Sequence, residues 1–353
     1  MKSRNLQFAV GLILGLLFIW VLFRGTHWKE VFEAIYYAKI GWLLIALLLM
    51  CLTFVIRVQR WRYIVQTAGP VSFRAIFSAT QIGFLGNFLL PARIGEVIRA
   101  LVLARLQQWP FSKCFAFVAL DRVTDLFGLL AVLGISLFVF RPKGDINLPP
   151  DVYAHPIPSD LLRSGAILLG LVILIGVGVL VILYLNQHWV TRFVAGTVGR
   201  VSKGIAEKLN RILIQFADGM HIFRAPRDMI KALLFSLLTW TVAVLFLDAV
   251  LRAFSLDYPW YTPLIMQALI ALFISLPGAP GFIGQYHMAI VAGLIISSPD
   301  TNLEVARAAA IMAHLLNLLP VAATGFWCLY IEQFNLIELK KIGEALEETH
   351  TEN

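Results

Sequence analysis

The chain has 353 residues and a formal net charge of +8; 59% of its residues are hydrophobic and only 14% are Asp, Glu, Lys or Arg. Because a soluble domain carries about 25% charged residues, this composition excludes an ordinary soluble protein and predicts an all-α polytopic membrane protein. The excess of positive charge indicates membrane orientation, and we expect no nucleic-acid partner. The three cysteines show neither metal-ligand spacing nor a disulfide framework, and we expect no metal or cofactor.

The first apolar segments are an anchor and a full span. Residues 6–23 are too long for a typical signal-peptide core, and no small-x-small cleavage site follows, so a retained anchor is expected. A second span is predicted over 40–56. It would end at a basic cluster that marks the cytoplasmic side, as do the basic residues near the N-terminus: Arg57, Arg60 and Arg62, with Lys2 and Arg4.

The stretch "NFLLPARIGEVIR", residues 87–99, interrupts the next apolar region with a proline, a glycine and three charges. Residues 57–70 and the start of the span near Ser112 are both predicted on the cytoplasmic side, so residues 71–110 must leave and return. Two short arms flanking the break favour a re-entrant helical hairpin. Two full spans joined by an external tip are the alternative.

The middle of the chain is predicted to cross the membrane twice. Residues 112–141 would run outward and 161–187 back in, around a proline-rich external loop over 142–160. The basic segment 188–229 is expected to be a cytoplasmic amphipathic linker.

The second half repeats the first in the opposite orientation. A span over 230–254, two short arms broken by "PGAPGFIG" (277–284) and a last span over 305–331 precede a cytoplasmic tail, 332–353. We therefore predict inverted repeats over 40–141 and 230–331, with about six full spans and two broken hairpins. Such repeats with Gly/Pro-interrupted helices are typical of transporters. The expected location is a bacterial or archaeal cytoplasmic membrane, with both termini inside.

The charges of the first hairpin are Arg93, Glu96 and Arg99, which lie three residues apart and share one side of a helix. A charge at bilayer depth costs at least ~2.5–3.5 kcal/mol and normally faces a partner or a cavity. Two interpretations stay open: an Arg–Glu–Arg ladder that holds the hairpin, or a site where the remaining positive charge meets an anion such as a lipid phosphate.

A second charged cluster, "ALDRVTDLFG", lies near the middle of the following span. Asp121 and Asp125 share a helix face, and Arg122 reaches Asp125. These residues form either a substrate or proton-relay site, or a neutralised network with Arg93 or Arg99, and both can hold together.

The second hairpin offers glycines that permit close backbone approach and polar groups beside a helix start. Its candidate residues are Pro280, Gly281, Gly284, Gln285 and His287, and the last span adds His314 and Asn317, with Gln267 completing a polar lining. If His287 lines the pathway, its charge change near pH 6.5 would make transport pH-dependent. The alternative is a packed interior histidine. Asp248 and Arg252 are expected to form a structural pair.

Together, "NFLLPARIGEVIR", "ALDRVTDLFGLL" and "PGAPGFIGQYH" resemble the lysylphosphatidylglycerol synthase transmembrane-region family of flippase-like membrane proteins. The resemblance implies movement of lipids or lipid-linked precursors between leaflets. It marks as site residues Asn87, Pro91, Arg93, Gly95, Glu96, Arg99, Asp121, Arg122, Asp125, Pro280, Gly281 and Gly284.

Two departures from the family pattern shape the functional expectation. His287 stands where many relatives place an acidic residue, and the soluble aminoacyl-transfer domain of bifunctional relatives is missing, so we expect no lysyl-lipid synthesis. The leading hypothesis is a translocator for a membrane lipid with an anionic head group or a lipid-linked precursor. The alternative is a membrane-embedded transferase or accessory subunit acting on a polyprenyl-phosphate-linked or phospholipid substrate. A homo-oligomer and a lipid-biosynthetic enzyme partner stay open.

Overall fold

The computed structural model describes residues 2–90, 94–140, 225–275 and 278–335, with single positions between 145 and 197. Within these residues the chain is all-helical, as predicted. The α-helices are α1 (Lys2–Phe23), α2 (Trp28–Tyr36), α3 (Ile40–Val65), α4 (Phe73–Leu89), α5 (Gly95–Gln107), α6 (Phe111–Val139), α10 (Pro226–Ala253), α11 (Thr262–Ser275), α12 (Gln285–Ser297) and α13 (Leu303–Ile331).

Several predicted segments fall largely or wholly outside the described residues. These are the loop over 142–160, the span over 161–187, the linker over 188–229 and the tail beyond residue 335. Pro91 and Arg93, at the tip of the first hairpin, also lie outside them.

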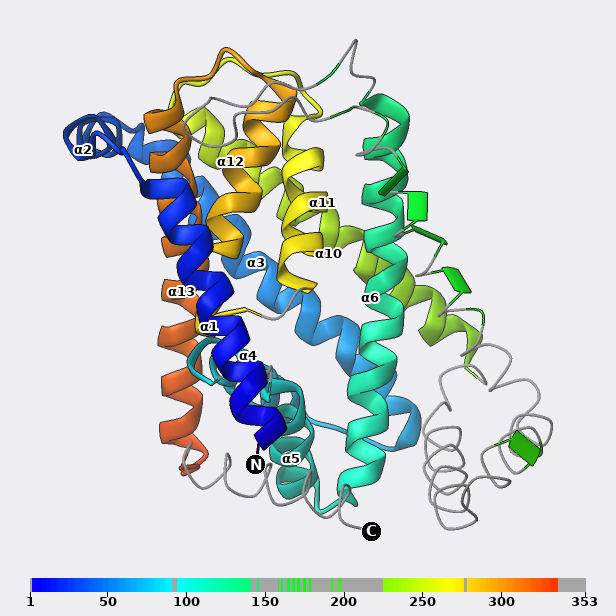
Figure 1. Ribbon diagram of the computed structural model, residues 1–353. Coiled ribbons are helices and arrows are strands. Elements are labelled where there is room, and N and C mark those ends of the chain that lie inside the picture. Colours follow the sequence, from blue (N-terminus) through cyan, green and yellow to red (C-terminus); the bar gives the residue numbers. More distant parts are fainter. Residues whose placement is uncertain are drawn as a thin grey trace.

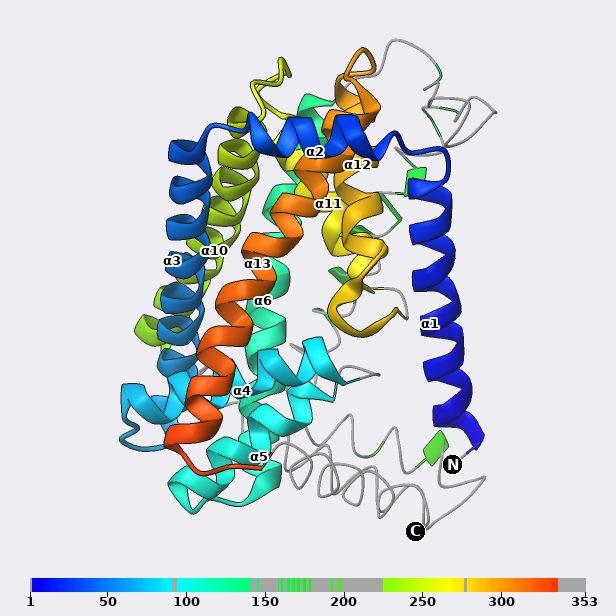
Figure 2. The same ribbon diagram turned by 90° about the vertical axis from the view of Figure 1, so that its left-hand side faces the viewer.

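The described part contains enough long apolar helices for a multi-pass membrane protein. Five stretches are long and apolar enough to cross a bilayer: Ile40–Ala68, Phe111–Val139, Pro226–Ala253, Pro280–Ser297 and Leu303–Ile331. A sixth would be the pair Leu12–Phe23 and Trp28–Tyr36, which is bent by 87°. The bend turns α2 across one end of the bundle (Figure 2).

The helix that contains the predicted span 40–56 is longer than that span. It continues as a single helix, α3, to Val65, and therefore carries Arg57 and Arg60 within it. The Arg60 side chain is 1% exposed and is ion-paired with carboxylates of α6. This charge is thus neutralised inside the helical bundle.

The two broken hairpins enter from opposite ends of the bundle. Helices α4 and α5 lie at one end, and α11 and α12 at the other (Figures 1 and 2). At 1.5 Å per residue the α-helical arms alone span only about 20–25 Å, less than a hydrocarbon core of about 30 Å. The stretch Pro280–Ser297 counts as a candidate span only with the short turn that precedes α12. The hairpins meet inside the bundle, where the Phe88 ring lies edge-on to Phe282 with centroids 6.2 Å apart. Re-entrance and an inverted internal repeat stay predictions.

Glycines allow the arms of the first hairpin to pack backbone against backbone. A Cβ at Gly83 would lie 2.7 Å from the Cβ of Arg99 and 2.9 Å from the carbonyl oxygen of Gly95. A Cβ at Gly95 would lie 2.5 Å from Asn87 Oδ1 and would also clash with the Gly83 carbonyl. The close fit places Glu96 and Arg99 at fixed positions against α6.

We expect Gly95→Ala to lower the free energy of unfolding by about 1–3 kcal/mol, because the added methyl group has no room. Gly134→Ala in α6 is the matched control, since a Cβ added there would have nothing within 4 Å and alanine is the better helix former. Unfolding of both variants in one detergent provides the measurement. Equal stabilities would show that the arms do not need the glycine.

Candidate functional site

Asp121 on α6 lies between two arginines from different elements. Its carboxylate accepts a hydrogen bond from Arg60 Nε on α3 at 2.9 Å and from Arg99 Nη1 on α5 at 2.6 Å. All three side chains are at most 2% exposed. The Arg99 guanidinium also stacks 3.6 Å from the centre of the Trp61 ring. A single carboxylate thus connects α3, the first hairpin and α6.

Asp125, one turn further along α6, extends the network toward the centre of the bundle. It accepts from Arg60 Nη1 at 2.5 Å and from Trp240 Nε1 on α10 at 3.1 Å. Arg122 lies 3.5 Å from Asp125 and 2.8 Å from Glu96 on α5. Every carboxylate of this network therefore faces at least one guanidinium.

These contacts decide between the interpretations of the first motif. The Arg–Glu–Arg ladder is wrong for its described members, since Glu96 pairs with Arg122 and Arg99 pairs with Asp121. The proposed link from Arg99 to Asp121 is confirmed. Glu96 and Arg99 do lie on one helix, α5, as predicted. Each of them pairs with a residue of opposite charge on α6 instead of with the other. The predicted Asp248–Arg252 pair is also confirmed, at 2.6 Å.

Next to the network is a cavity of about 280 Å³, bordered by both hairpins and by α3, α6, α10 and α13. Of the predicted site residues, it is lined by Asn87, Glu96, Arg122, Asp125, Gly281, His314 and Asn317. Gln267 lines it as well. Arg99 and Asp121 are not among the lining residues, nor are Pro280, Gly284, Gln285 and His287.

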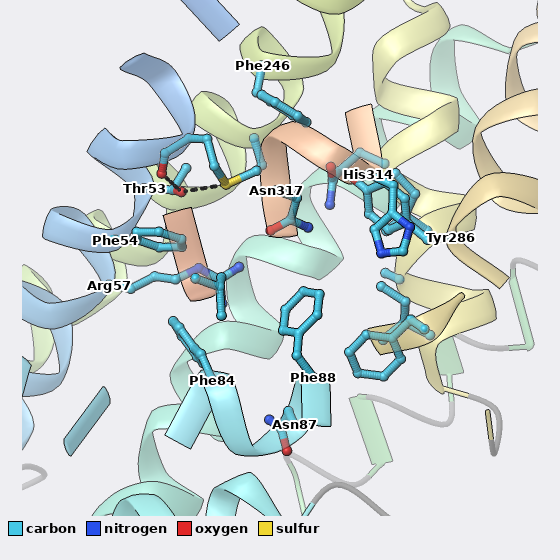
Figure 3. Close-up of a pocket in the computed structure, with 18 of the residues that line it drawn as sticks. Thr53, Phe54, Arg57, Phe84, Asn87, Phe88, Phe246, Tyr286, His314 and Asn317 are labelled. Carbon is cyan, nitrogen blue, oxygen red and sulfur yellow. Dashed lines mark hydrogen bonds between the residues drawn. The ribbon is translucent and has the colours of Figure 1, made fainter. Parts of the chain in front are cut away.

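Arg57 also lines the cavity, although the sequence pattern placed it in a basic cluster on the cytoplasmic side. It reaches from α3 toward the centre of the cavity (Figure 3). Among the described residues it has no ion pair or hydrogen bond, and its nearest cation–π contact is Phe84, with the guanidinium 5.8 Å from the ring centre. The signal that could have found it is the apolar pattern continuing through "VIRVQRWRYIV", which places Arg57 and Arg60 on one face of a longer helix.

The model of the Lysylphosphatidylglycerol synthase TM region family matches residues 8–325. The chain belongs to this family. Glycosyltransferase AglD of Haloferax volcanii is 25% identical over 333 residues, which cover 88% of this chain and 52% of that protein. A UPF0104 membrane protein of Methanocaldococcus jannaschii is 28% identical over 141 residues, 38% of this chain and 42% of its own length. The chain thus spans about half the length or less of these two relatives.

A third relative aligns with this chain over most of the length of both proteins. A UPF0104 membrane protein of Methanothermobacter thermautotrophicus is 22% identical over 336 residues, covering 90% of this chain and 93% of that protein. The match confirms the resemblance drawn from the three motifs. In the described part of the chain, no group of three or more His, Cys, Asp or Glu residues is arranged to hold a metal ion.

Two histidines close the tip of the second hairpin. The Gly284 N–H donates to His287 Nδ1 at 3.3 Å, so His287 carries its proton on Nε2, which lies 3.3 Å from His314 Nδ1. His314 then carries its proton on Nε2 and donates to the Gly281 carbonyl at 2.9 Å. All four ring nitrogens have partners when both rings are neutral. His287 is thus a satisfied interior residue, and His314 is the histidine that faces the cavity.

This chain of hydrogen bonds predicts one tautomer for each ring. The ¹⁵N spectrum of histidine-labelled protein at neutral pH should show both residues neutral with the proton on Nε2, assigned by His287→Gln and His314→Gln. A ring protonated on Nδ1 would contradict the order of donors and acceptors.

Loss of the central carboxylate should destabilise the fold. We expect Asp121→Asn to cost about 3–5 kcal/mol, because it leaves Arg99 buried without a carboxylate partner and leaves Arg60 with Asp125 alone. Asp248→Asn removes half of a partly exposed pair and should melt close to wild type. Melting temperatures of both variants in the same detergent test this. An Asp121→Asn protein as stable as the control would show that the network is not structural.

Proposed function

We propose that this protein moves a lipid or lipid-linked precursor between membrane leaflets, with the anionic head group passing through the cavity between the two hairpins. The observation that carries this proposal is Arg57. A charge at bilayer depth without a partner costs at least ~2.5–3.5 kcal/mol, so a guanidinium that faces a cavity without an ion pair indicates an anion in that cavity. A lipid phosphate is an anion that a membrane always supplies.

The architecture supports the same proposal. The cavity lies where two helices broken by Gly and Pro meet, which is where transporters place their substrate sites. The ion-paired network holds α3, α5 and α6 together, so Arg57 stands on a fixed wall. The second hairpin forms the facing wall and packs against the first through Phe88 and Phe282. Movement of one hairpin against the other would open the cavity to one leaflet at a time.

Leaflet exchange of a fluorescent anionic lipid in proteoliposomes tests the proposal. We expect Arg57→Gln to slow exchange about tenfold or more, because a charge-assisted hydrogen bond contributes about 1.5–3 kcal/mol. Arg57→Lys should recover only part of the rate, because lysine lacks the bidentate fork. Rates are normalised to monodisperse protein.

The matched control is Arg252→Gln, which removes an arginine of α10 that lies away from the cavity, paired with Asp248. Its rate should equal that of wild type. Wild-type exchange in Arg57→Gln would remove Arg57 from the pathway and with it the observation on which the proposal rests.

A membrane-embedded transferase is the second candidate. It is favoured by one relative, which bears the name glycosyltransferase and aligns with 88% of this chain, although only 52% of that relative is covered. The carboxylates that line the cavity, Glu96 and Asp125, would supply a base. The two functions separate in purified proteoliposomes: chemical change of the added lipid supports the transferase, and leaflet exchange without chemical change supports the translocator.

A further inference from the structure

We propose that the cavity selects a phosphodiester lipid that carries a single negative charge and a neutral, hydroxyl-bearing head group no larger than about one sugar or polyol unit. The inference rests on the proposed function and specifies the substrate class of the same site. Three properties of the cavity carry it: the charge balance of its described residues, the neutral polar side chains on the side that faces Arg57, and its size.

The charge balance favours one negative charge. The described residues of the wall and of the network behind it supply four guanidinium groups, Arg57, Arg60, Arg99 and Arg122, and three carboxylates, Glu96, Asp121 and Asp125. Arginine stays charged in proteins, and each carboxylate is ion-paired. The described groups thus carry one positive charge in excess, which lies at Arg57. A phosphodiester neutralises it, whereas a phosphomonoester or a diphosphate would leave negative charge uncompensated in a low dielectric.

The side chains that would bind the head group are neutral. On the side facing Arg57, the cavity presents Tyr286, His314 and Asn317 (Figure 3), and Gln267 adds a second amide. Tyrosine and the amides can each exchange hydrogen bonds with hydroxyl groups. In the described part of the wall, this side contributes no charged group that would call for an ion in the head group.

Hydroxyl groups suit this lining better than an ammonium group. A hydroxyl group both donates to and accepts from amides and a tyrosine without adding charge. An ammonium group only donates, and it would add positive charge to a wall whose described residues already carry an excess.

The size and the aromatic lining limit the head group further. A cavity of about 280 Å³ lies just below the range of small-molecule sites, which measure about 300–1,000 Å³. Aromatic rings line it from both hairpins and from α3 and α10, namely Phe54, Phe84, Phe88, Trp240, Phe246, Phe282 and Tyr286. Such rings pack against the apolar faces of a sugar or a short polyol while the amides bind its hydroxyls. An oligosaccharide would not fit.

Binding of defined lipids to the purified full chain, measured by native mass spectrometry and thermal stabilisation, tests the inference. The first probes are phosphatidylglycerol and a hexosyl phosphoprenol, which share the phosphodiester and the hydroxylated head but come from different lipid classes. We expect one or both to bind about tenfold or more tighter than phosphatidic acid, a prenyl diphosphate, phosphatidylethanolamine and lysyl-phosphatidylglycerol. The probe that binds more tightly identifies the lipid class from which the substrate comes.

Phosphatidylethanol separates charge from hydroxyl recognition, because it keeps the phosphodiester and lacks the hydroxyl groups. Wild type should prefer phosphatidylglycerol or the hexosyl lipid over it, and Asn317→Leu should lose that preference while keeping anion binding. Arg57→Gln should lose anion binding, and Arg252→Gln should behave as wild type. Equal binding of phosphatidylethanol, or tighter binding of phosphatidic acid, the diphosphate or an amine-bearing lipid, overturns the inference.

These outcomes are distinct from failure of the proposed function. Selective binding without leaflet exchange would refute translocation and leave the substrate class standing. Leaflet exchange at the same rate for every head group would leave translocation standing and refute the substrate class.

Discussion

The arrangement depends on one buried carboxylate that serves two arginines. Asp121 accepts from Arg60 and Arg99 at 2.9 and 2.6 Å, and neither arginine is more than 2% exposed. Removing any partner would leave a charge in low dielectric, so α3, α5 and α6 must stay in register. Arg57 lies one turn before Arg60 on α3. The ion pairs that hold Arg60 therefore also fix Arg57 at the cavity wall.

Within the described part of the chain, no carboxylate lies at ion-pair distance from Arg57, because the nearby acids contact other arginines. Arg60 and Arg99 use Asp121, Arg60 and Arg122 use Asp125, and Arg122 also uses Glu96. A structural network needs only as many cations as it has acids, and the described residues of this one supply one more cation than acids. In an apolar bundle such an excess is costly unless a ligand compensates it. The same network thus accounts for the rigidity of the first hairpin and for the positive potential of the cavity.

Much of this architecture follows from sequence, because hydropathy and Gly/Pro breaks act locally. The helix breaks near Pro91 and at "PGAPGFIG" were predicted. The contact of Arg99 with Asp121 was one of the pairings expected for these charges, since few partners exist for a buried charge. The burial of Arg60 and the position of Arg57 at the cavity were not predicted, because arginines after an apolar run usually mark a loop. The carboxylate that pairs with Arg60 inside the bundle lies 61 residues away. Local pattern carries no information about such a partner. For His287 it left open a position on the pathway or in the packed interior, and the contact with His314 favours the second.

The most direct test of this mechanism is a cryo-electron-microscopy map of the protein in nanodiscs that contain the tightest-binding anionic lipid. We expect a phosphate within about 2.7–2.9 Å of the Arg57 guanidinium, with the head group between the two hairpins and Asp121 still bridging Arg60 and Arg99. A map in which Arg57 pairs with Asp125 or another carboxylate, and no lipid phosphate enters the cavity, would contradict it.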